Sequence, residues 1–286
     1  MNIMNFATRN VVSVLPDDSI DKAICLMEER GFRHLPVQVD GRVVGMVSDR
    51  DILLSTGWAL EVERQAPDVL GQRVVGPTRI EQIMSRPAVS LSSASTAGEA
   101  ARLMLERKIG ALPVVQGGRT VGIVTETDLL HWLEELASGG SPAARFLDCP
   151  VRELMRVQVV TVRPEQPLSD VIDVFRRYRV RHVPVAVNDR LVGILSDRDV
   201  RRVLGWASVH MGEVDAAGRE VERPRAAGQV MQREVRTASP ADTLREALHL
   251  MLRQHIHALP VVENERLVGI LTQTDFIKAI ARQELL

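Results

Sequence analysis

The stretch GFRHLPV at Gly31–Val37 decides the fold, because it recurs three more times along the 286-residue chain in changed form. The copies read KIGALPV, YRVRHVPV and HIHALPV, and they lie at Lys108–Val114, Tyr178–Val185 and His255–Val261. Nine residues after the proline of each copy comes a glycine. Fifteen residues after it comes an aspartate, which a serine or threonine precedes by three positions. Four copies in one register indicate a fourfold internal repeat.

A second level of duplication lies above the first. Repeats one and three share the letters RH before the proline motif and also share SDRD, whereas repeats two and four share ALPVV and end in TETD or TQTD. The chain is therefore predicted to consist of two similar halves, each with two unlike repeats. The segment SGGSP at Ser138–Pro142 lies between the halves, and its glycine and serine content predicts a flexible joint.

Each repeat carries the same succession of secondary-structure signals. Apolar residues within Ile20–Met27 recur at the spacing of one helix face, and the other repeats keep these offsets. Two short runs rich in valine then flank Asp40–Gly41, which predicts a hairpin, and a second helix is predicted from Asp49 onward. A short first strand is also predicted before each first helix, at residues 11–14, 89–91, 159–162 and 235–237. A β-α-β-β-α unit of about 55–60 residues buries little surface alone, so we expect neighbouring repeats to pair.

With these motifs the chain resembles the cystathionine β-synthase (CBS) domain family, and the resemblance covers nearly its whole length. It implies a mixed α/β (α+β) fold, in which four β-α-β-β-α repeats form two tandem pairs, or Bateman modules. The two modules are expected to form a flat pseudo-symmetric disc, similar in layout to the γ subunit of the AMP-activated protein kinase. Pairing of two chains into a homodimer is left open. The expected boundaries are repeats at 1–56, 80–137, 151–205 and 227–286, a linker at 138–150, connectors at 57–79 and 206–226, and modules at 1–137 and 148–286.

Composition limits where such a chain acts and what it binds. Hydrophobic residues make up 45% and charged residues 26%, which is typical of a soluble globular protein. No apolar run approaches the roughly 18 residues of a membrane span. The two cysteines, Cys25 and Cys149, form no paired motif, and the first ten residues lack the pattern of a secretory signal, so we expect a cytoplasmic protein. A net charge of −1 disfavours nucleic acid as a partner.

The repeated Ser/Thr-x-x-Asp motif lies where the second strand is predicted to end and the second helix to begin. One interpretation is helix capping, because this spacing matches a capping box. The other is ligand binding, because a carboxylate can accept hydrogen bonds from two adjacent hydroxyls. In CBS domains this aspartate commonly binds the ribose of an adenine nucleotide, and the hydroxyl residue lies near ribose or phosphate. The resemblance therefore gives as candidates Asp51, Asp128, Asp199 and Asp275, with Ser48, Thr125, Ser196 and Thr272.

Basic side chains near the proline motif and within SDRD are the candidate phosphate ligands. Charge-assisted contacts from forked guanidinium groups suit phosphate, and the resemblance implies the same role. The alternative is that they are ordinary solvated strand residues. Because Glu126 is acidic and Thr127 and Thr274 are neutral, repeats one and three are predicted to form the better anion sites. The candidates are Arg33, His34, Arg50, Arg181, His182, Arg198 and His257.

These residues predict a non-catalytic regulatory module rather than an enzyme. It would bind AMP, ADP, ATP or S-adenosylmethionine between paired repeats as a regulatory ligand, and its changed geometry would control a separate effector protein. The alternative is a constitutive assembly scaffold with empty clefts. No nucleophile–base pair is recognisable, so no catalytic residue or catalytic cofactor is assigned. The pair His255 and His257 is not assigned to a metal, because the repeat register accounts for it and no third ligand lies near in sequence.

Overall fold

The computed structural model describes residues 2–55, 77–209 and 225–282, with the backbone alone for 204–209. The connectors expected at 57–79 and 206–226 therefore lie mostly outside the described residues. Each repeat begins with one short helical turn, followed in turn by a helix, a two-stranded hairpin and a second helix.

The order predicted from the sequence, helix–hairpin–helix, is found in every repeat. In repeat one the second helix begins at Asp49 and is described as far as residue 55. The initial turns are η1 (Ile3–Asn5), η2 (Ile80–Gln82), η3 (Val151–Glu153) and α8 (Ala227–Val230). The remaining elements, from repeat one to repeat four, are α1 (Ile20–Arg30), β1 (His34–Val39) and β2 (Arg42–Ser48); α3 (Ala97–Arg107), β4 (Ala111–Gln116), β5 (Arg119–Thr125) and α4 (Glu126–Leu136); α6 (Leu168–Tyr178), β6 (His182–Val187), β7 (Arg190–Ser196) and α7 (Asp197–Val209); and α9 (Leu244–Arg253), β8 (Ala258–Glu263), β9 (Arg266–Thr272) and α10 (Gln273–Ala281).

A two-residue turn joins the two strands of each hairpin. Both turn residues have positive φ in all four copies, for example 52° at Asp40 and 76° at Gly41. Two consecutive positive φ angles are the geometry of a type I′ turn, which matches the twist of the strands that it joins. In each hairpin the strand residue after the proline lies opposite the repeated glycine, as Val37 does opposite Gly45.

The predicted first strand is wrong for three repeats. Only repeat two has one, β3 (Leu91–Ser92), which pairs in parallel with β4. The others keep a single parallel bridge, formed by Val14, Val162 and Ala238. Two residues after each of these bridges stands a proline, which has no N–H to extend the ladder. Repeat two has Ser93 there, and its N–H donates to the carbonyl of Val115 at 3.0 Å.

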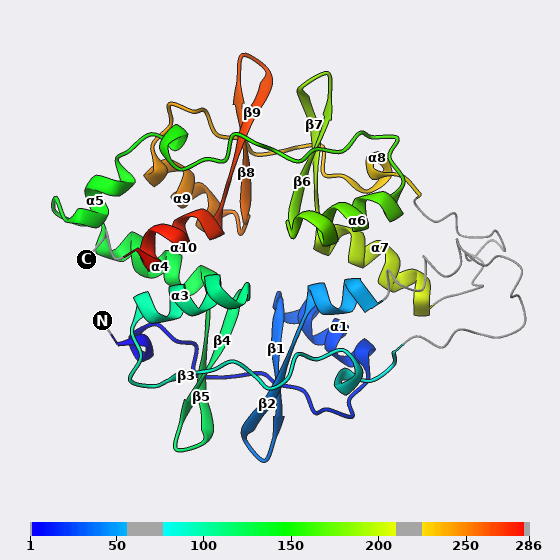
Figure 1. Ribbon diagram of the computed structural model, residues 1–286, viewed down its shortest axis with the longest axis vertical. Coiled ribbons are helices and arrows are strands. Elements are labelled where there is room, and N and C mark those ends of the chain that lie inside the picture. Colours follow the sequence, from blue (N-terminus) through cyan, green and yellow to red (C-terminus); the bar gives the residue numbers. More distant parts are fainter. Residues whose placement is uncertain (1, 56–76, 210–224, 283–286) are drawn as a thin grey trace, which may run out of the picture.

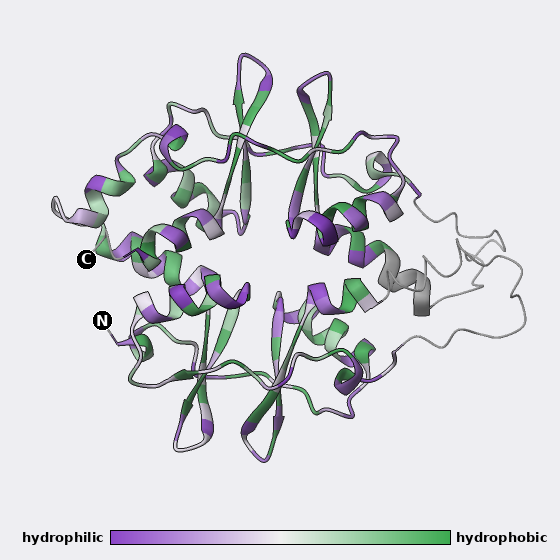
Figure 2. Cartoon of the chain, viewed as in Figure 1, coloured by the Kyte–Doolittle hydropathy of each residue, from purple (hydrophilic) through white to green (hydrophobic). Residues whose placement is uncertain are grey.

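The four repeats form a flat disc with the two modules on opposite sides of a midline (Figure 1). Within each module the hairpins approach each other, β2 beside β5 and β7 beside β9. Across the midline, repeats two and four share one apolar core that includes Trp132 and Phe276. Repeats one and three form two smaller cores, and Leu53 of repeat one packs in that of repeat three. Apolar residues fill the middle of the hairpins, and hydrophilic residues lie at the turns of β6–β7 and β8–β9 (Figure 2).

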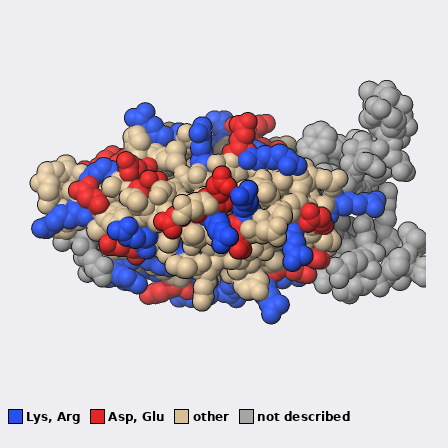
Figure 3. Space-filling model, turned by 90° about the horizontal axis from the view of Figure 1, so that it is seen from above, with Lys and Arg blue, Asp and Glu red and all other residues tan. Residues whose placement is uncertain are grey.

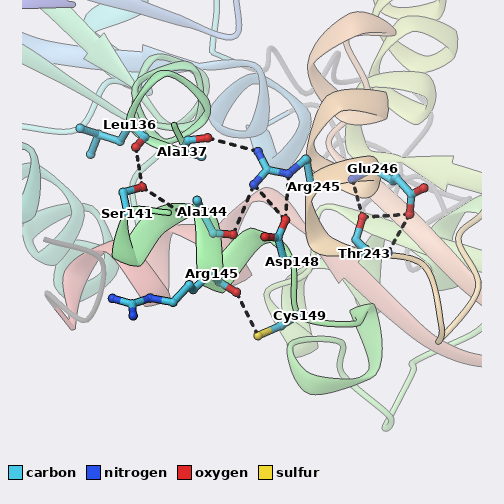
Figure 4. A network of polar contacts seen from close by, with 10 residues as sticks. All are labelled: Leu136, Ala137, Ser141, Ala144, Arg145, Asp148, Cys149, Thr243, Arg245 and Glu246. Carbon is cyan, nitrogen blue, oxygen red and sulfur yellow. Dashed lines mark hydrogen bonds and ion pairs between the residues drawn. The ribbon is translucent and has the colours of Figure 1, made fainter. Parts of the chain in front are cut away.

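The segment between the modules contains a helix directly after the glycines of the predicted joint. Ser141 accepts a hydrogen bond from the N–H of Ala144 and Pro142 occupies the first turn, so α5 (Pro142–Leu147) begins directly after the glycines. Arg245 of α9 donates to Asp148 at 2.9 and 3.0 Å, and also to the carbonyls of Ala137, before this helix, and of Ala144, within it (Figure 4). The linker is thereby fixed to repeat four.

Candidate functional site

Each Ser/Thr-x-x-Asp motif caps the helix that follows its strand. In repeat one, Asp51 Oδ2 accepts from the N–H of Ser48 at 2.8 Å and from its hydroxyl at 2.6 Å. The hydroxyl oxygen of Ser48 in turn accepts from the N–H of Asp51 at 3.2 Å. The same three hydrogen bonds recur between Thr125 and Asp128 and between Ser196 and Asp199. The capping interpretation is therefore confirmed for these three motifs.

Capping uses only one of the two carboxylate oxygens in the first three repeats. Among the described residues, Oδ1 of Asp51, Asp128 and Asp199 accepts no hydrogen bond, and it is not among the buried unpaired atoms. These three side chains are half-buried. Burial raises the pKa of Asp51 and of Asp128, while the hydrogen bonds of the cap act in the opposite direction. Each motif therefore presents one carboxylate oxygen that is free to accept from a ligand.

A loop from the paired repeat faces each of these caps. The loops that follow the initial turns pair with the second strands through single bridges: Thr8 with Ile123, Ser85 with Met46, Arg156 with Ile270 and Gln232 with Ile194. The repeated glycine permits this approach. A Cβ at Gly45 would lie 2.9 Å from the carbonyl oxygen of Ser85, closer than such atoms come in proteins. Each cap thus lies at a junction built by both repeats of one module.

The fourth junction differs because Asp275 has other partners. Its Oδ2 accepts from Thr272, as in the other repeats, but its Oδ1 accepts from Arg156 Nε at 2.9 Å and from Lys278 Nζ at 3.0 Å. Arg156 Nη2 also donates to the hydroxyl of Thr272 at 3.4 Å. Only 2% of Asp275 is exposed. The structure therefore places Asp275 at the predicted position, with both carboxylate oxygens already engaged by the protein.

The predicted phosphate ligands come together at the centre of the disc, where the strands β1, β4, β6 and β8 begin (Figure 1). The side chain of Arg33 is only 12% exposed, so it is not a solvated strand residue. The ring of His182 stacks on that of His257 with a centroid distance of 6.2 Å. A Cβ at Gly110 would lie 2.9 Å from the guanidinium of Arg181, which passes over this glycine. We call the following residues the central cluster: Arg33, His34, Asp49, Glu126, Arg181, His182, Asp197 and His257.

Carboxylates of the same cluster already face its arginines. Arg33 lies 3.4 Å from Asp49 and 3.7 Å from Asp197, and Arg181 lies 3.7 Å from Glu126. These separations exceed those of charge-assisted hydrogen bonds. Arg33 Nε, Asp49 Oδ2 and Asp197 Oδ1 are buried without a hydrogen bond. Sequence reasoning missed both aspartates, although SDRD in repeats one and three was the signal that could have found them.

The histidines of the centre are uncharged at neutral pH. Loss of hydration, reinforced by the charges of nearby arginines, lowers the pKa of His34 to about 3 and that of His257 to about 4. The pKa of His182 is lowered for the same reasons. Burial, with the neighbouring charge of Asp49, raises the pKa of Asp197 to about 6. These imidazoles would therefore meet an anion as uncharged hydrogen-bond donors, and the positive charge of the centre comes from arginine.

Arg50 and Arg198 join the two modules. Arg50 Nη2 donates to the carbonyl of Phe175 at 3.2 Å, and Arg198 Nη2 donates to that of Phe32 at 3.0 Å. These reciprocal hydrogen bonds link repeat one with repeat three. The structure therefore gives both predicted phosphate ligands a role in holding the modules together.

The described residues contain no cluster of three or more side chains that could hold a metal ion. Within the same ranges, no helix is long and apolar enough to cross a membrane. Cys25 and Cys149 are free thiols.

The chain belongs to the CBS domain family. The family model for the CBS domain matches residues 3–55, 80–135, 151–205 and 227–282, which is more than half of the chain. The likeness extends over the whole length of an uncharacterised protein of Methanocaldococcus jannaschii, MJ1225. Its sequence is 30% identical over 292 residues, covering 98% of this chain and 99% of that protein.

The crystal structure of MJ1225, described as that of a candidate archaeal homologue of g-AMPK, superimposes with a TM-score of 0.81. That alignment has 27% sequence identity and covers 98% of this chain and all of the other. A conserved, uncharacterised protein of Pyrococcus horikoshii aligns over 98% of this chain and all of its own, with a TM-score of 0.63 and 21% identity. At that identity the second likeness shows the fold alone.

Proposed function

We propose that this chain is a non-catalytic regulatory module that binds adenine nucleotides at junctions between paired repeats. The observation that carries the proposal is the divided use of three carboxylates: one oxygen of Asp51, Asp128 and Asp199 caps a helix, and the other is open to solvent. A fixed carboxylate oxygen with spare acceptor capacity suits the adjacent hydroxyls of a ribose. Membership of the CBS domain family, in which this aspartate commonly binds the ribose of an adenine nucleotide, supports the adenine nucleotide as ligand.

The central cluster supports a negatively charged group on that ligand. Its arginines lie 3.4–3.7 Å from their carboxylates, so their donors are not committed to short hydrogen bonds. A phosphate group could bring closer, charge-assisted contacts to Arg33 or Arg181. Because residues of all four repeats meet here, a ligand that binds here would favour one relative placement of the modules. The ligand can shift the balance between two placements of the modules only by as much as its affinity for them differs.

A thermal-denaturation panel tests the proposal. The intact chain is heated with AMP, ADP, ATP, S-adenosylmethionine or inorganic phosphate. A ligand at 100 times its dissociation constant stabilises the folded state by about 2.7 kcal/mol. We expect at least one adenosine compound to raise the melting temperature more than phosphate alone does.

A matched variant ties this stabilisation to the carboxylates. The triple change of Asp51, Asp128 and Asp199 to Asn keeps one oxygen for each cap but replaces the other by an NH₂ group, which cannot accept from ribose. We expect the variant to fold and to lose the stabilisation by nucleotide. Flat melting curves of the unaltered chain with every compound would overturn the proposal and favour a constitutive scaffold.

A further inference from the structure

One position in each repeat determines which side chain lies opposite the cap of the paired repeat. The residue that follows the initial turn and bridges to the paired repeat is Thr8, Ser85, Arg156 or Gln232. Of these four, only Arg156 makes a hydrogen bond to the aspartate of the facing motif. The position three residues after that aspartate is occupied by Leu54, His131, Arg202 and Lys278 in the four repeats, and of these four described side chains only Lys278 donates to its aspartate.

The contacts at the fourth junction occupy both oxygens of Asp275. Oδ2 accepts from the N–H and hydroxyl of Thr272 at 3.0 and 2.6 Å, and Oδ1 accepts from two cations at 2.9 and 3.0 Å. Arg156 comes from a loop 119 positions earlier in the chain. It covers Asp275, which is 2% exposed, whereas the three equivalent aspartates are half-buried.

We propose that Arg156, together with Lys278, closes the fourth junction to ribose and so determines which copies of the repeat bind ligand. The inference rests on the proposed nucleotide-binding function. A ribose could reach Asp275 only by displacing two cations from the carboxylate oxygen, and its neutral hydroxyls carry no charge to replace those ion pairs. The chain therefore binds nucleotide at no more than the three junctions of Asp51, Asp128 and Asp199.

Exchange of residues between two junctions of the same module tests this inference. Arg156→Gln places at the fourth junction the residue that faces Asp199, and Gln232→Arg makes the reciprocal change. In the double variant Arg156→Gln/Lys278→Leu, leucine takes the place that it has at position 54 of repeat one. Equilibrium dialysis with saturating AMP measures moles bound per mole of chain, and circular dichroism confirms that each variant is folded.

We expect Arg156→Gln or the double variant to bind one AMP more than the unaltered chain, and Gln232→Arg to bind one fewer. The inference is overturned if the unaltered chain binds four AMP molecules. It is equally overturned if AMP binds but neither Arg156 variant raises the number bound, or if Arg156→Gln lowers it, which would make Arg156 a ligand contact. Absence of AMP binding to every folded variant would overturn the proposed function itself, and the inference with it.

Discussion

The junctions of Asp199 and Asp275 lie in the same module and carry the same Ser/Thr-x-x-Asp motif, yet their chemistry differs. Each aspartate uses Oδ2 to accept a hydroxyl hydrogen bond of 2.6 Å. At Asp199 the facing loop carries Gln232 and the second oxygen is open. At Asp275 the facing loop carries Arg156 and the second oxygen is engaged. A repeated motif therefore fixes the position of a carboxylate, whereas the paired repeat decides whether that carboxylate can bind a ligand.

The largest expected difference concerns nucleotide affinity. We predict that Asp199→Asn weakens AMP binding at one junction about 10- to 100-fold, because a hydrogen bond to a charged acceptor contributes about 1.5–3 kcal/mol. Asp275→Asn should leave AMP affinity unchanged, because Asp275 has no oxygen to offer. Isothermal titration calorimetry measures both. Equal losses in the two variants would remove the distinction between the junctions.

Two arginines of repeat three extend the comparison from ribose to phosphate. Arg181→Gln should weaken ATP binding about tenfold while changing adenosine binding less than twofold, because Arg181 lies in the central cluster and its loss removes one charge-assisted contact. Arg156→Gln should weaken neither ligand. Competition assays with the two ligands measure these ratios. A parallel loss of ATP and adenosine affinity in Arg181→Gln would count against phosphate contact.

For the stability of the ligand-free chain we expect the opposite order, with the larger effect at Asp275. Asp275→Asn should lower the free energy of unfolding by about 1 kcal/mol, because it removes the charge that pairs with Arg156 and Lys278, both of them partly exposed. Asp199→Asn keeps its cap and should cost less. Urea denaturation without ligand measures the difference. A larger loss for Asp199→Asn would mean that capping, rather than pairing with Arg156 and Lys278, dominates the energetics of these aspartates.

The smallest expected effect is a pH dependence of stability, which arises in the central cluster and not at the junctions. The folded-state pKa of His34 (about 3) and of His257 (about 4) lies below the usual 6.5, so these side chains contribute stability that is present above pH 6.5 and is lost as the pH falls. At pH 6 the loss is about 1 kcal/mol or less for each histidine. Asp197, with a pKa raised to about 6, contributes in the opposite direction, since the folded chain takes up its proton first.

Chemical denaturation at pH 7.5 and pH 6 measures this balance. We expect the unaltered chain to be less stable at pH 6, and His34→Gln to reduce the difference, because glutamine does not titrate. Ser85→Ala should leave the pH dependence unchanged, since Ser85 does not titrate and lies outside the central cluster. The same pH dependence with and without His34 would contradict the assignment of a depressed pKa to this histidine.

The sequence predicts those features that depend on local patterns. Helix faces such as that of Ile20, Ala23 and Met27, the hairpins and the caps all follow from spacings within one repeat, and the structure confirms them. The short first strands were predicted from valine-rich runs without regard to the prolines that end them. The helix α5 was not predicted, although Ser141 and Pro142 start it directly after the glycines between the modules.

The remaining features depend on contacts between repeats. The position of Arg156 within its own repeat gives no sign that it reaches Asp275, because that contact requires knowledge of which loop faces which strand. The pairing of Arg33 with Asp49 and Asp197 likewise joins repeats one and three. A single sequence does not show which residues of different repeats lie close together, so all four aspartates were candidates for ribose and only the nearby basic residues distinguished the repeats.

A crystal structure of the intact chain grown with saturating AMP tests the central claim most directly. The account predicts ribose hydroxyls within hydrogen-bond distance of Oδ1 of Asp51, Asp128 and Asp199, with Oδ2 of each still in its cap and Arg156 still on Asp275. A structure with AMP bound at Asp275, or with only water at the other three carboxylates, would contradict it.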